Sequence, residues 1–384
     1  MSKIDELIQE LCPDGVVYMA IKDICNAHYG KGNNIPQDGG SIPVYGCAGV
    51  VGHTSVSNAS NVPLIGHIGS AGKVVWGEGD FYATYNVTIC EPKVELITAR
   101  FLYFSLLKLN PRKFVKGSQP FLSVSDFDKK KIPVPPLEIQ EEIVRILDSF
   151  TELEKELEKE LSLRQKQYEY YREFLFSDIS DSYHMSVGDL FDFKNGLNKG
   201  KDFFGSGTAI VNFTDVYHGG KLYGALLKGR VEVNQEEICR YSAKRGDVFF
   251  TRTSETREEI GISATLVDDI ENCVFSGFVL RARPKTELLL PEYCAYCFST
   301  YKVRRFIIRN SNFTTRALTN GGILSKLTIP VPPVEIQKKI ADTLDLLSLY
   351  VDGVYVGLPA EIEARHKQYE YYRDKLLTFK EKVS

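Results

Sequence analysis

One run of side chains in this sequence concentrates groups that can bond bases and phosphates. It follows an apolar, strand-like stretch at 247–251 and reads Thr-Arg-Thr-Ser-Glu-Thr-Arg over 251–257. Arginine suits guanine edges or phosphates, and hydroxyl groups suit the backbone or bases of a nucleic acid. The alternative is a solvated turn. The candidates are Thr251, Arg252, Thr253 and Ser254, and the equivalent place in the first half of the chain holds His67, Ser70 and Lys73.

Two glycine-rich basic loops form a second matched pair. Residues 29–34 read Tyr-Gly-Lys-Gly-Asn-Asn, and residues 195–201 read Asn-Gly-Leu-Asn-Lys-Gly-Lys. Glycine allows the backbone to approach a ligand closely, and lysine and amide groups bond phosphate oxygens. A plain surface loop fits the same residues equally well. The candidates are Lys31, Asn33, Asn34, Asn198, Lys199 and Lys201.

A third matched pair comes shortly before each of two Pro-Pro motifs. Residues 117–120 read Gly-Ser-Gln-Pro, and residues 313–316 read Phe-Thr-Thr-Arg. Ser118, Gln119 and Arg316 are the candidates here. An amide or a guanidinium at this place either reads a base edge or caps the following helix.

The sequence lacks complete motifs for a nucleotide-binding P-loop, a zinc site or a methyltransferase. Residues 66–74 resemble a phosphate-binding P-loop, but His67 stands where the first glycine belongs and Val74 replaces the Ser or Thr that would hold magnesium. Cys294 and Cys297 have zinc-like spacing, but no second Cys-x-x-Cys supplies the remaining ligands, which favours buried helix cysteines. The Asn/Asp-Pro-Pro-aromatic motif and glycine-rich cofactor loop of a methyltransferase are missing. We therefore expect no catalytic centre and no metal in this chain.

Composition sets wide limits. The 384 residues are 43% hydrophobic and 25% charged, which is typical of a globular protein of two to four domains. The sequence has neither a membrane-spanning run nor a signal-peptide core, and its eight cysteines are scattered. We therefore expect a cytoplasmic protein without a membrane partner. A net charge of −3 argues against a uniformly basic surface but leaves room for a local basic groove.

An internal repeat organises the chain. Residues 132–140 read Ile-Pro-Val-Pro-Pro-Leu-Glu-Ile-Gln and return with one change at 329–337, which is 197 positions later. Residues 166–172, Lys-Gln-Tyr-Glu-Tyr-Tyr-Arg, return unchanged at 367–373, which is 201 positions later. Weaker matches extend upstream at offsets of 166 and 192. The chain is therefore one unit written twice, with a divergent globular part and a strongly similar helical part in each copy.

The helical parts follow from apolar spacing. Residues 137–176 contain neither Gly nor Pro and carry apolar residues at coiled-coil spacing from Ile143 to Leu157, followed by a stutter, so we predict one helix of about 60 Å. Helix breakers at 352–359 predict two helices in the second copy, at 334–351 and 359–380. We expect an antiparallel pair with the globular parts at opposite ends. Helix spacing places four tyrosines between the helices, with part of their surface left for a partner subunit: Tyr168, Tyr171, Tyr369 and Tyr372.

The globular parts are predicted to be mixed α/β. Strand-like runs occupy 62–65, 73–76 and 87–90 in the first part and 209–213, 247–251 and 278–281 in the second, and a helix follows each set at 98–109 and 291–309. The helical stretches 138–178 and 335–382 together carry seven more acidic than basic residues, which leaves the remainder with a net charge of +4. The predicted organisation is domain 1 at 1–135, helix 136–178, domain 2 at 179–332 and a helical region at 333–384.

Two divergent α/β parts, each followed by the Pro-Pro motif and a long helix with the Lys-Gln-Tyr-Glu-Tyr-Tyr-Arg motif, resemble the DNA-specificity subunit of type I restriction–modification systems. The resemblance covers nearly the whole chain. It implies an α+β architecture in which two target-recognition domains are separated by two long antiparallel, coiled-coil-like helices, with an internal pseudo-two-fold repeat. The turn-like stretch near 353–359 departs from the family pattern and puts the straightness of the second helix in question.

The resemblance also implies a function. Each domain would read one half of a split double-stranded DNA site, which favours DNA contact over a solvated turn at 251–257. The helices would space the domains and dock two modification (methyltransferase) subunits, and restriction subunits would complete the complex. S-adenosylmethionine, ATP and magnesium would then belong to the partners. Two alternatives stay open at this point: a single-chain methyltransferase or nuclease, and a structural protein that dimerises through its helices.

Overall fold

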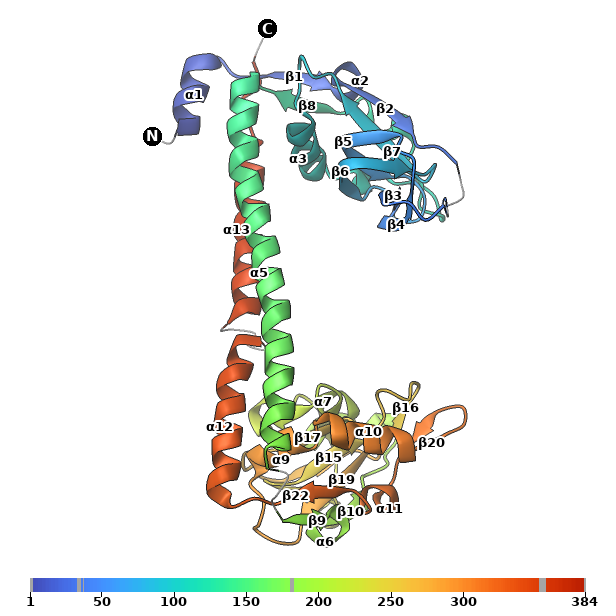
Figure 1. The fold of residues 1–384 in the computed structure, drawn as a ribbon, viewed down its shortest axis with the longest axis vertical. Coiled ribbons are helices and arrows are strands. Elements are labelled where there is room, and N and C mark those ends of the chain that lie inside the picture. The colour runs from blue at the N-terminus through green and yellow to red at the C-terminus, as the bar shows by residue number, and fades with distance from the viewer. Residues whose placement is uncertain (1–2, 33–35, 37, 180–182, 352–356, 383–384) are drawn as a thin grey trace. The chain divides into compact units, whose positions relative to one another are not determined.

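The computed structural model describes residues 3–32, 36, 38–179, 183–351 and 357–382, and it divides into two compact units. Unit 1 comprises residues 1–158 and 361–384, and unit 2 comprises residues 159–360. Each unit combines one α/β domain with part of the helical region (Figure 1). Among the helices of the described residues, none has both the length and the apolar character needed to cross a membrane.

The α/β domain of unit 1 is built on a six-stranded sheet with the order β2-β7-β5-β6-β3-β4. Its strands are β2 (Cys25–Tyr29), β3 (Ile42–Gly46), β4 (Gly49–Thr54), β5 (Ala59–Gly66), β6 (Val74–Ala83) and β7 (Val87–Pro92). A two-stranded ladder joins β1 (Val17–Ala20) to β8 (Lys131–Val134). The helices are α1 (Lys3–Leu11), α2 (Ile21–Ile24), α3 (Ala99–Leu109), η1 (Pro111–Phe114) and α4 (Val124–Phe127).

The helix predicted at 98–109 is confirmed as α3. It begins where the Thr98 hydroxyl accepts a hydrogen bond from the Phe101 amide at 3.3 Å, and it ends at Asn110 in the left-handed conformation with φ of +53°. Phe101 and Phe104 are fully buried and pack α3 against the sheet. This core sets the rigid frame on which the loops of unit 1 are carried.

The α/β domain of unit 2 contains a five-stranded sheet of order β10-β19-β15-β17-β12, a four-stranded sheet of order β13-β11-β18-β14 and a three-stranded sheet of order β16-β21-β20. Strand β9 (His184–Ser186) pairs separately with β22 (Thr328–Pro330). The other strands are β10 (Phe191–Asn195), β11 (Phe204–Val211), β12 (Gly220–Leu222), β13 (Arg230–Val231), β14 (Ser242–Ala243), β15 (Val248–Thr251), β16 (Thr253–Ser254), β17 (Ser263–Leu266), β18 (Cys273–Phe275), β19 (Val279–Pro284), β20 (Asn312–Phe313) and β21 (Ala317–Leu318). The helices are α6 (Val187–Leu190), η2 (Lys201–Phe203), α7 (Phe213–Tyr217), η3 (Gly224–Leu226), α8 (Gln235–Arg240), α9 (Pro291–Cys297), α10 (Tyr301–Asn310) and α11 (Gly321–Leu324).

Two predictions for this domain need correction. The single helix expected at 291–309 is two helices, because the hydroxyl groups of Ser299 and Thr300 donate to the carbonyl groups of Tyr296 and Cys297 and end α9. The strand expected at 209–213 ends at Val211, because Asn212 is the N-cap of α7. The expectation for the cysteine pair is confirmed, since Cys294 and Cys297 are buried core residues of α9.

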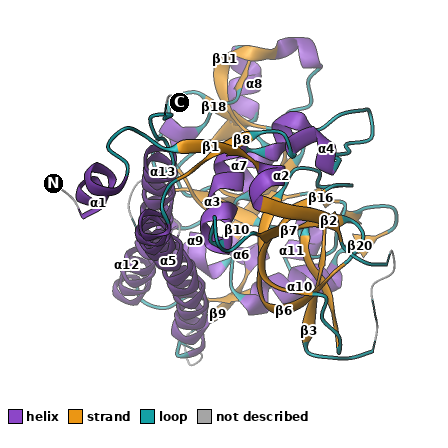
Figure 2. Cartoon of the chain, turned by 90° about the horizontal axis from the view of Figure 1, so that it is seen from above, coloured by secondary structure: helices purple, strands orange, loops and turns teal. Residues whose placement is uncertain are grey.

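The predicted helices of the repeat are confirmed, except that the last one ends four residues before the predicted residue 380. Helix α5 (Leu137–Ser177) is continuous, and the second copy contains α12 (Val334–Val351) and α13 (Leu358–Leu376). In unit 1, α13 lies along the first part of α5, and in unit 2, α12 lies along its second part (Figure 1, Figure 2). The most buried stripe of α5, Ile139, Ile143 and Leu147, belongs to the α/β core of unit 1, so the predicted seam residues Ile146 and Phe150 are only half-buried.

The two units repeat the same register where the α/β domains meet the helices. The β1–β8 ladder pairs Met19 with Ile132, and the β9–β22 ladder pairs Met185 with Ile329. Met185 follows Met19 by 166 positions and Ile329 follows Ile132 by 197, which are two of the offsets found in the sequence. The duplication therefore extends to the sheet pairing that precedes each Pro-Pro motif.

Candidate nucleic-acid interface

Three loops and a hairpin converge in unit 1. The glycine loop after β2 is held by a hydrogen bond from the Lys31 amide to the Ala83 carbonyl at 2.9 Å. The segment after β5 is held by His67, whose amide donates to Asn86 at 3.1 Å and whose carbonyl accepts from Leu122 at 3.0 Å. We call this set, residues 30–32, 67–73, 84–86 and 116–121, the unit 1 loop cluster.

The equivalent segments of unit 2 are joined in the same way. The Leu197 amide donates to Phe275 at 2.9 Å. The Arg252 amide donates to Phe278 at 3.3 Å, and its carbonyl accepts from Thr319 at 3.1 Å. We call residues 196–201, 252–257, 276–278 and 312–318 the unit 2 loop cluster. His67 and Arg252 therefore occupy the same place in the two clusters.

Glycine is required at the base of each glycine loop. A Cβ atom on Gly30 would lie 2.4 Å from the carbonyl oxygens of Ala83 and Thr84, and one on Gly196 would lie 2.2 Å from the carbonyl oxygen of Ser276. These distances are well below van der Waals contact, so each loop packs against the turn before β7 or β19 only because the side chain is absent. The packing fixes the exposed residues that follow each glycine.

The structure divides the sequence candidates by exposure. Six have exposed side chains and are available to a ligand: Lys31, Ser118, Gln119, Asn198, Lys201 and Arg316. Five are partly exposed: Ser70, Lys73, Lys199, Arg252 and Thr253. Asn33 and Asn34 lie outside the described residues.

Three candidates need correction, because their side chains are buried and cannot meet DNA directly. The Thr251 hydroxyl donates to the Glu259 carbonyl at 3.1 Å and accepts from the Ile262 amide at 2.9 Å. The Ser254 hydroxyl donates to the Glu259 carboxylate at 3.1 Å. The His67 ring is fully buried against Tyr29, Tyr85 and Phe121, and burial lowers its pKa, which keeps the imidazole neutral.

Glu259 anchors the loop that carries Arg252 and Thr253. The Tyr217 hydroxyl donates to one of its carboxylate oxygens at 2.6 Å, and Ser254 donates to the other. The Tyr217 hydrogen bond is the main reason that the pKa of Glu259 lies below its usual value. The loop after β15 is therefore held in place before any ligand arrives.

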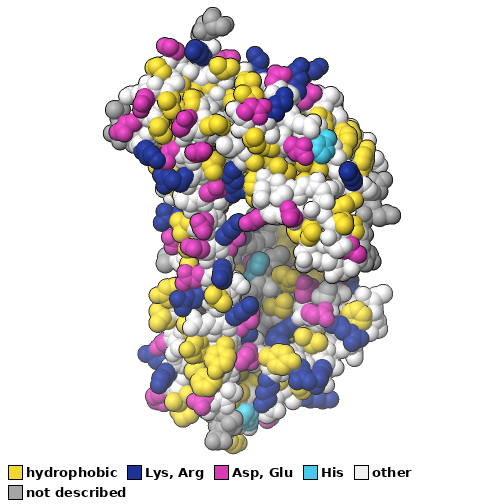
Figure 3. Space-filling view, turned by 45° about the horizontal axis from the view of Figure 1, so that its top comes forward, with side chains coloured by type: hydrophobic (Ala, Val, Ile, Leu, Met, Phe, Trp, Pro, Cys, Tyr) yellow, Lys and Arg dark blue, Asp and Glu magenta, His cyan; other side chains and the backbone are white. Residues whose placement is uncertain are grey.

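Local ion pairs and hydrogen bonds already engage some of the basic candidates. The ammonium group of Lys199 lies 2.8 Å from Glu237, and that of Lys73 donates to the Ala48 carbonyl at 2.7 Å. Arg316 lies 3.8 Å from Glu255, and both side chains stay exposed. The face drawn in Figure 3 mixes basic and acidic side chains over the visible surface. On this face the basic side chains do not form one broad surface, so DNA contact there would depend on particular loops.

The four candidate tyrosines of the helices differ between the units. In unit 1, Tyr369 is buried in the core, and Tyr372 stacks on Phe150 with ring centroids 5.5 Å apart. In unit 2, Tyr168 packs against the core and Tyr171 stays exposed.

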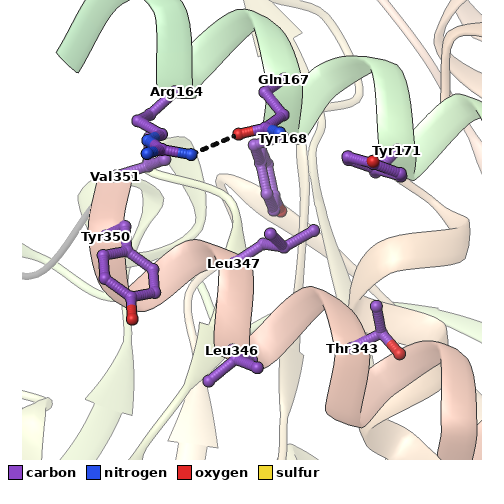
Figure 4. A pocket seen from close by; sticks show the side chains of 9 residues that line it. All are labelled: Arg164, Gln167, Tyr168, Tyr171, Thr343, Leu346, Leu347, Tyr350 and Val351. Carbon is purple, nitrogen blue, oxygen red and sulfur yellow. Dashed lines mark hydrogen bonds between the residues drawn. The ribbon is translucent and has the colours of Figure 1, made fainter. Parts of the chain in front are cut away.

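An apolar groove of about 480 Å³ opens between α5 and α12 in unit 2 (Figure 4). It is lined by Arg164, Gln167, Tyr168, Tyr171, Thr343, Leu346, Leu347, Tyr350 and Val351.

The sequence candidates omit two kinds of residue. Gln140 and Gln337 are fully buried and hydrogen-bonded in the repeated motif, whose identity in both copies was the available signal. Exposed apolar side chains also stand in both loop clusters: Ile68, Tyr85 and Phe121 in unit 1, and Phe278, Phe313 and Leu318 in unit 2. No sequence signal marks this second group, because apolar residues in strand-rich segments are usually assigned to the core.

Comparison with known proteins gives one consistent result. A family model described as the type I restriction modification DNA specificity domain matches residues 13–163 and 180–364. A type I restriction enzyme specificity subunit from Haemophilus influenzae is 32% identical over 358 residues, which cover 88% of this chain and 89% of that protein. A type I restriction enzyme specificity subunit from Escherichia coli is 29% identical over 382 residues, with 88% and 87% covered.

Solved structures agree at the level of the fold. The crystal structure of the S subunit of a type I restriction–modification system from M. genitalium matches with a TM-score of 0.58 at 14% identity. The match covers 94% of this chain and 96% of that one. A chain from a study of complex assembly and conformational transition in a type I system also matches with a TM-score of 0.58, over 96% and 98% of the two chains.

Proposed function

This chain belongs to the family of type I restriction–modification DNA specificity subunits, and from that premise we propose that each loop cluster reads one half of a split DNA site. As a specificity subunit the chain recognises DNA and is itself non-catalytic, and catalysis lies in partner subunits. The unit 1 loop cluster would read one half-site and the unit 2 loop cluster the other.

The observation that carries this proposal is the shared backbone frame with different side chains. His67 and Arg252 are held by equivalent pairs of backbone hydrogen bonds, yet one is a buried imidazole and the other a partly exposed guanidinium. The adjoining hairpins carry Gln119 in one unit and Arg316 in the other. One frame that presents different hydrogen-bonding groups supports the reading of two different sequences.

The helices supply the surface proposed for partner subunits. We propose that two modification subunits dock on the helical parts, and that the apolar groove between α5 and α12 takes part on the unit 2 side. Leu346 and Tyr350 line this groove and are 59% and 55% exposed, so the groove and these side chains together form an apolar surface that a partner subunit can cover. Restriction subunits would join the same complex in the cytoplasm.

The cofactors would belong to those partners. We propose that S-adenosylmethionine is bound by the modification subunits, and that ATP and magnesium are used by the restriction subunits. Within the part of the chain that the structure describes, no group of three or more His, Cys, Asp or Glu side chains could hold a metal ion. The loop clusters offer hydrogen-bonding and cationic groups, which suit DNA itself.

The test is to express the chain with its modification partner in a host that lacks methylation of its own, and to map methylated bases across the genome. The proposal predicts a single motif made of two defined half-sites and an undefined gap. A matched culture without this chain should show no such motif. Methyl transfer from labelled S-adenosylmethionine by the purified chain alone, or methylation without a motif, would contradict the proposal.

A further inference from the structure

Exposed apolar side chains stand in matching turns and hairpins of both loop clusters. Phe278 is 66% exposed and accepts from Arg252 as Asn86 accepts from His67, and the residue before Asn86, Tyr85, is 42% exposed. Leu318 and Phe121 are each 41% exposed on the matching hairpins. Single exposed apolar residues are common, but a group that recurs in the same loops of two divergent domains indicates a ligand-binding surface.

In unit 2 the backbone holds these side chains on either side of Arg252. The Phe278 carbonyl accepts from the Arg252 amide, and Leu318 pairs with Thr253 across the β16–β21 ladder. Before Phe278, the Gly277 amide donates to the Leu197 carbonyl at 2.7 Å, and a Cβ atom on Gly277 would lie 1.9 Å from the Asn198 amide oxygen and displace that side chain. The Phe278 ring is therefore presented to solvent by a turn packed against two other candidate segments.

In unit 1 the same places surround His67. The ring centroids of Tyr85 and Phe121 lie 5.2 and 5.8 Å from that of His67, both at nearly perpendicular angles. Neither ring nitrogen of His67 has a hydrogen-bond partner among the residues that the structure describes. In unit 1 an aromatic layer therefore covers a neutral imidazole. At the same place in unit 2, Phe278 and Leu318 lie on either side of a guanidinium-bearing residue.

The chemistry of DNA offers one match for an apolar group next to hydrogen-bonding side chains. In the major groove, base edges display donors, acceptors and a single apolar group, the C5-methyl of thymine. Arg252 suits guanine O6 and N7, which are displayed in the same groove as that methyl group. Apolar wedges that enter the minor groove are the other known use of exposed phenylalanine in DNA binding.

Resting on the proposed function, we propose that the apolar group of each loop cluster contacts thymine C5-methyl groups of its own half-site. Phe278 and Leu318 do so in unit 2, and Tyr85 and Phe121 do so in unit 1. The side chains determine specificity because cytosine lacks the methyl group. Arg252, Gln119 and Arg316 supply the polar part of the same reading.

The test uses the complex of this chain with its modification subunits and duplexes that carry the mapped motif. Each thymine of the half-sites, on either strand, is replaced singly by deoxyuridine, which removes only the methyl group. In each half-site, deoxyuridine at one or more positions should weaken binding about three- to fivefold, as expected for one buried methyl group. In a Phe278→Ala complex the deoxyuridine effect in one half-site should vanish while the effect in the other half-site persists, and Phe121→Ala should show the reverse pattern.

Two variants keep the result interpretable. Phe278→Leu stays apolar and should keep part of the thymine preference. Leu226→Ala removes a side chain that is 69% exposed in the same unit but lies outside the loop cluster, and it should leave all affinities unchanged.

A deoxyuridine effect of equal size in wild type and in both aromatic variants would overturn the proposal. So would a half-site without thymine on either strand, or a loss of affinity in Phe278→Ala that is the same for every base, as a wedge would give. A wild-type complex without sequence preference would instead overturn the proposed function itself.

Discussion

Gln140 and Gln337 make the same three hydrogen bonds in the two units. The Gln140 amide nitrogen donates to the carbonyls of Leu96 and Pro135 at 2.9 and 2.8 Å, and its oxygen accepts from the Thr98 amide at 2.9 Å. Gln337 repeats this with Leu288, Pro332 and Leu290 at 2.8, 2.9 and 2.8 Å. Each glutamine therefore fastens the start of a long helix to the segment that leads into α3 or α9.

We expect Gln140→Ala to lower the free energy of unfolding of unit 1 by about 2–4 kcal/mol, because the change leaves buried backbone groups without partners. Gln337→Ala should do the same to unit 2. Hydrogen exchange under mild denaturant measures the two units separately. Gln165→Ala, at an exposed position of α5, is the matched control and should have little effect. Equal exchange in wild type and both variants would show that these bonds contribute nothing.

Arg252→Ala tests the polar reading by the unit 2 loop cluster. A bidentate contact with guanine predicts a loss of about 1–3 kcal/mol in binding that is confined to one position of one half-site. A phosphate contact predicts a nearly uniform loss and a shallower salt dependence. Binding by the assembled complex is measured over a salt series, with Arg245→Ala as a control because that residue pairs with Glu292 outside the loop cluster. Unchanged affinity and salt slope would leave Arg252 as a residue of a solvated turn.

The sequence predicts the helical half of the fold well and the loop surfaces only in part. Apolar spacing and helix breakers locate α5, α12 and α13, because a long helix is specified by local pattern. The sequence also matches the segment that holds His67, Ser70 and Lys73 with 251–257, and the backbone hydrogen bonds of His67 and Arg252 agree with that match. Burial of His67, Thr251 and Ser254 could not be predicted, because it depends on tertiary packing against Phe121 in unit 1 and on how the loop folds back to Glu259 in unit 2. The exposure of Phe278 could not be predicted either, because Phe278 begins a run of strand-forming residues and such a run predicts a buried side chain.

Glu142 predicts an acid-dependent contribution to stability. Its carboxylate is nearly buried and accepts from Arg145 at 2.7 Å and from Lys3 at 2.8 Å. These bonds, with Arg145 first, lower its pKa to about 2. Because the folded pKa lies below that of the unfolded chain, the contribution is complete above about pH 4.5 and is lost as the pH falls toward 2.

Glu142→Gln should therefore be less stable than wild type at pH 7, and the difference in free energy of unfolding should shrink as the pH falls from 4.5 toward 2. Urea unfolding at several pH values measures the difference. Glu156→Gln changes an exposed carboxylate of the same helix and should give a small offset at every pH. A Glu142→Gln difference that stays constant with pH would contradict the assigned ion pairs.

The continuity of α5 predicts that its length sets the gap between half-sites. Four residues inserted between Leu157 and Leu161 add about 6 Å and turn the helix by about 40°. One base pair advances about 3.4 Å, and two rotate the groove by about 70°. We therefore expect a methylated motif with a gap longer by one or two base pairs and unchanged half-sites. The same insertion after Asn272, in an exposed turn, should leave the gap unchanged. An active complex with its original gap would refute this role of α5.

Replacement of one domain tests the central claim most directly. Residues 15–130 of this chain are exchanged for the corresponding domain of another family member, and the complex with its modification subunits is mapped by long-read detection of methylated adenines. Because the unit 1 and unit 2 loop clusters are built from separate cores, we predict that one half of the motif changes to that of the donor while the other half and the gap stay the same. An active complex in which both halves change, or neither does, would contradict reading by two independent domains.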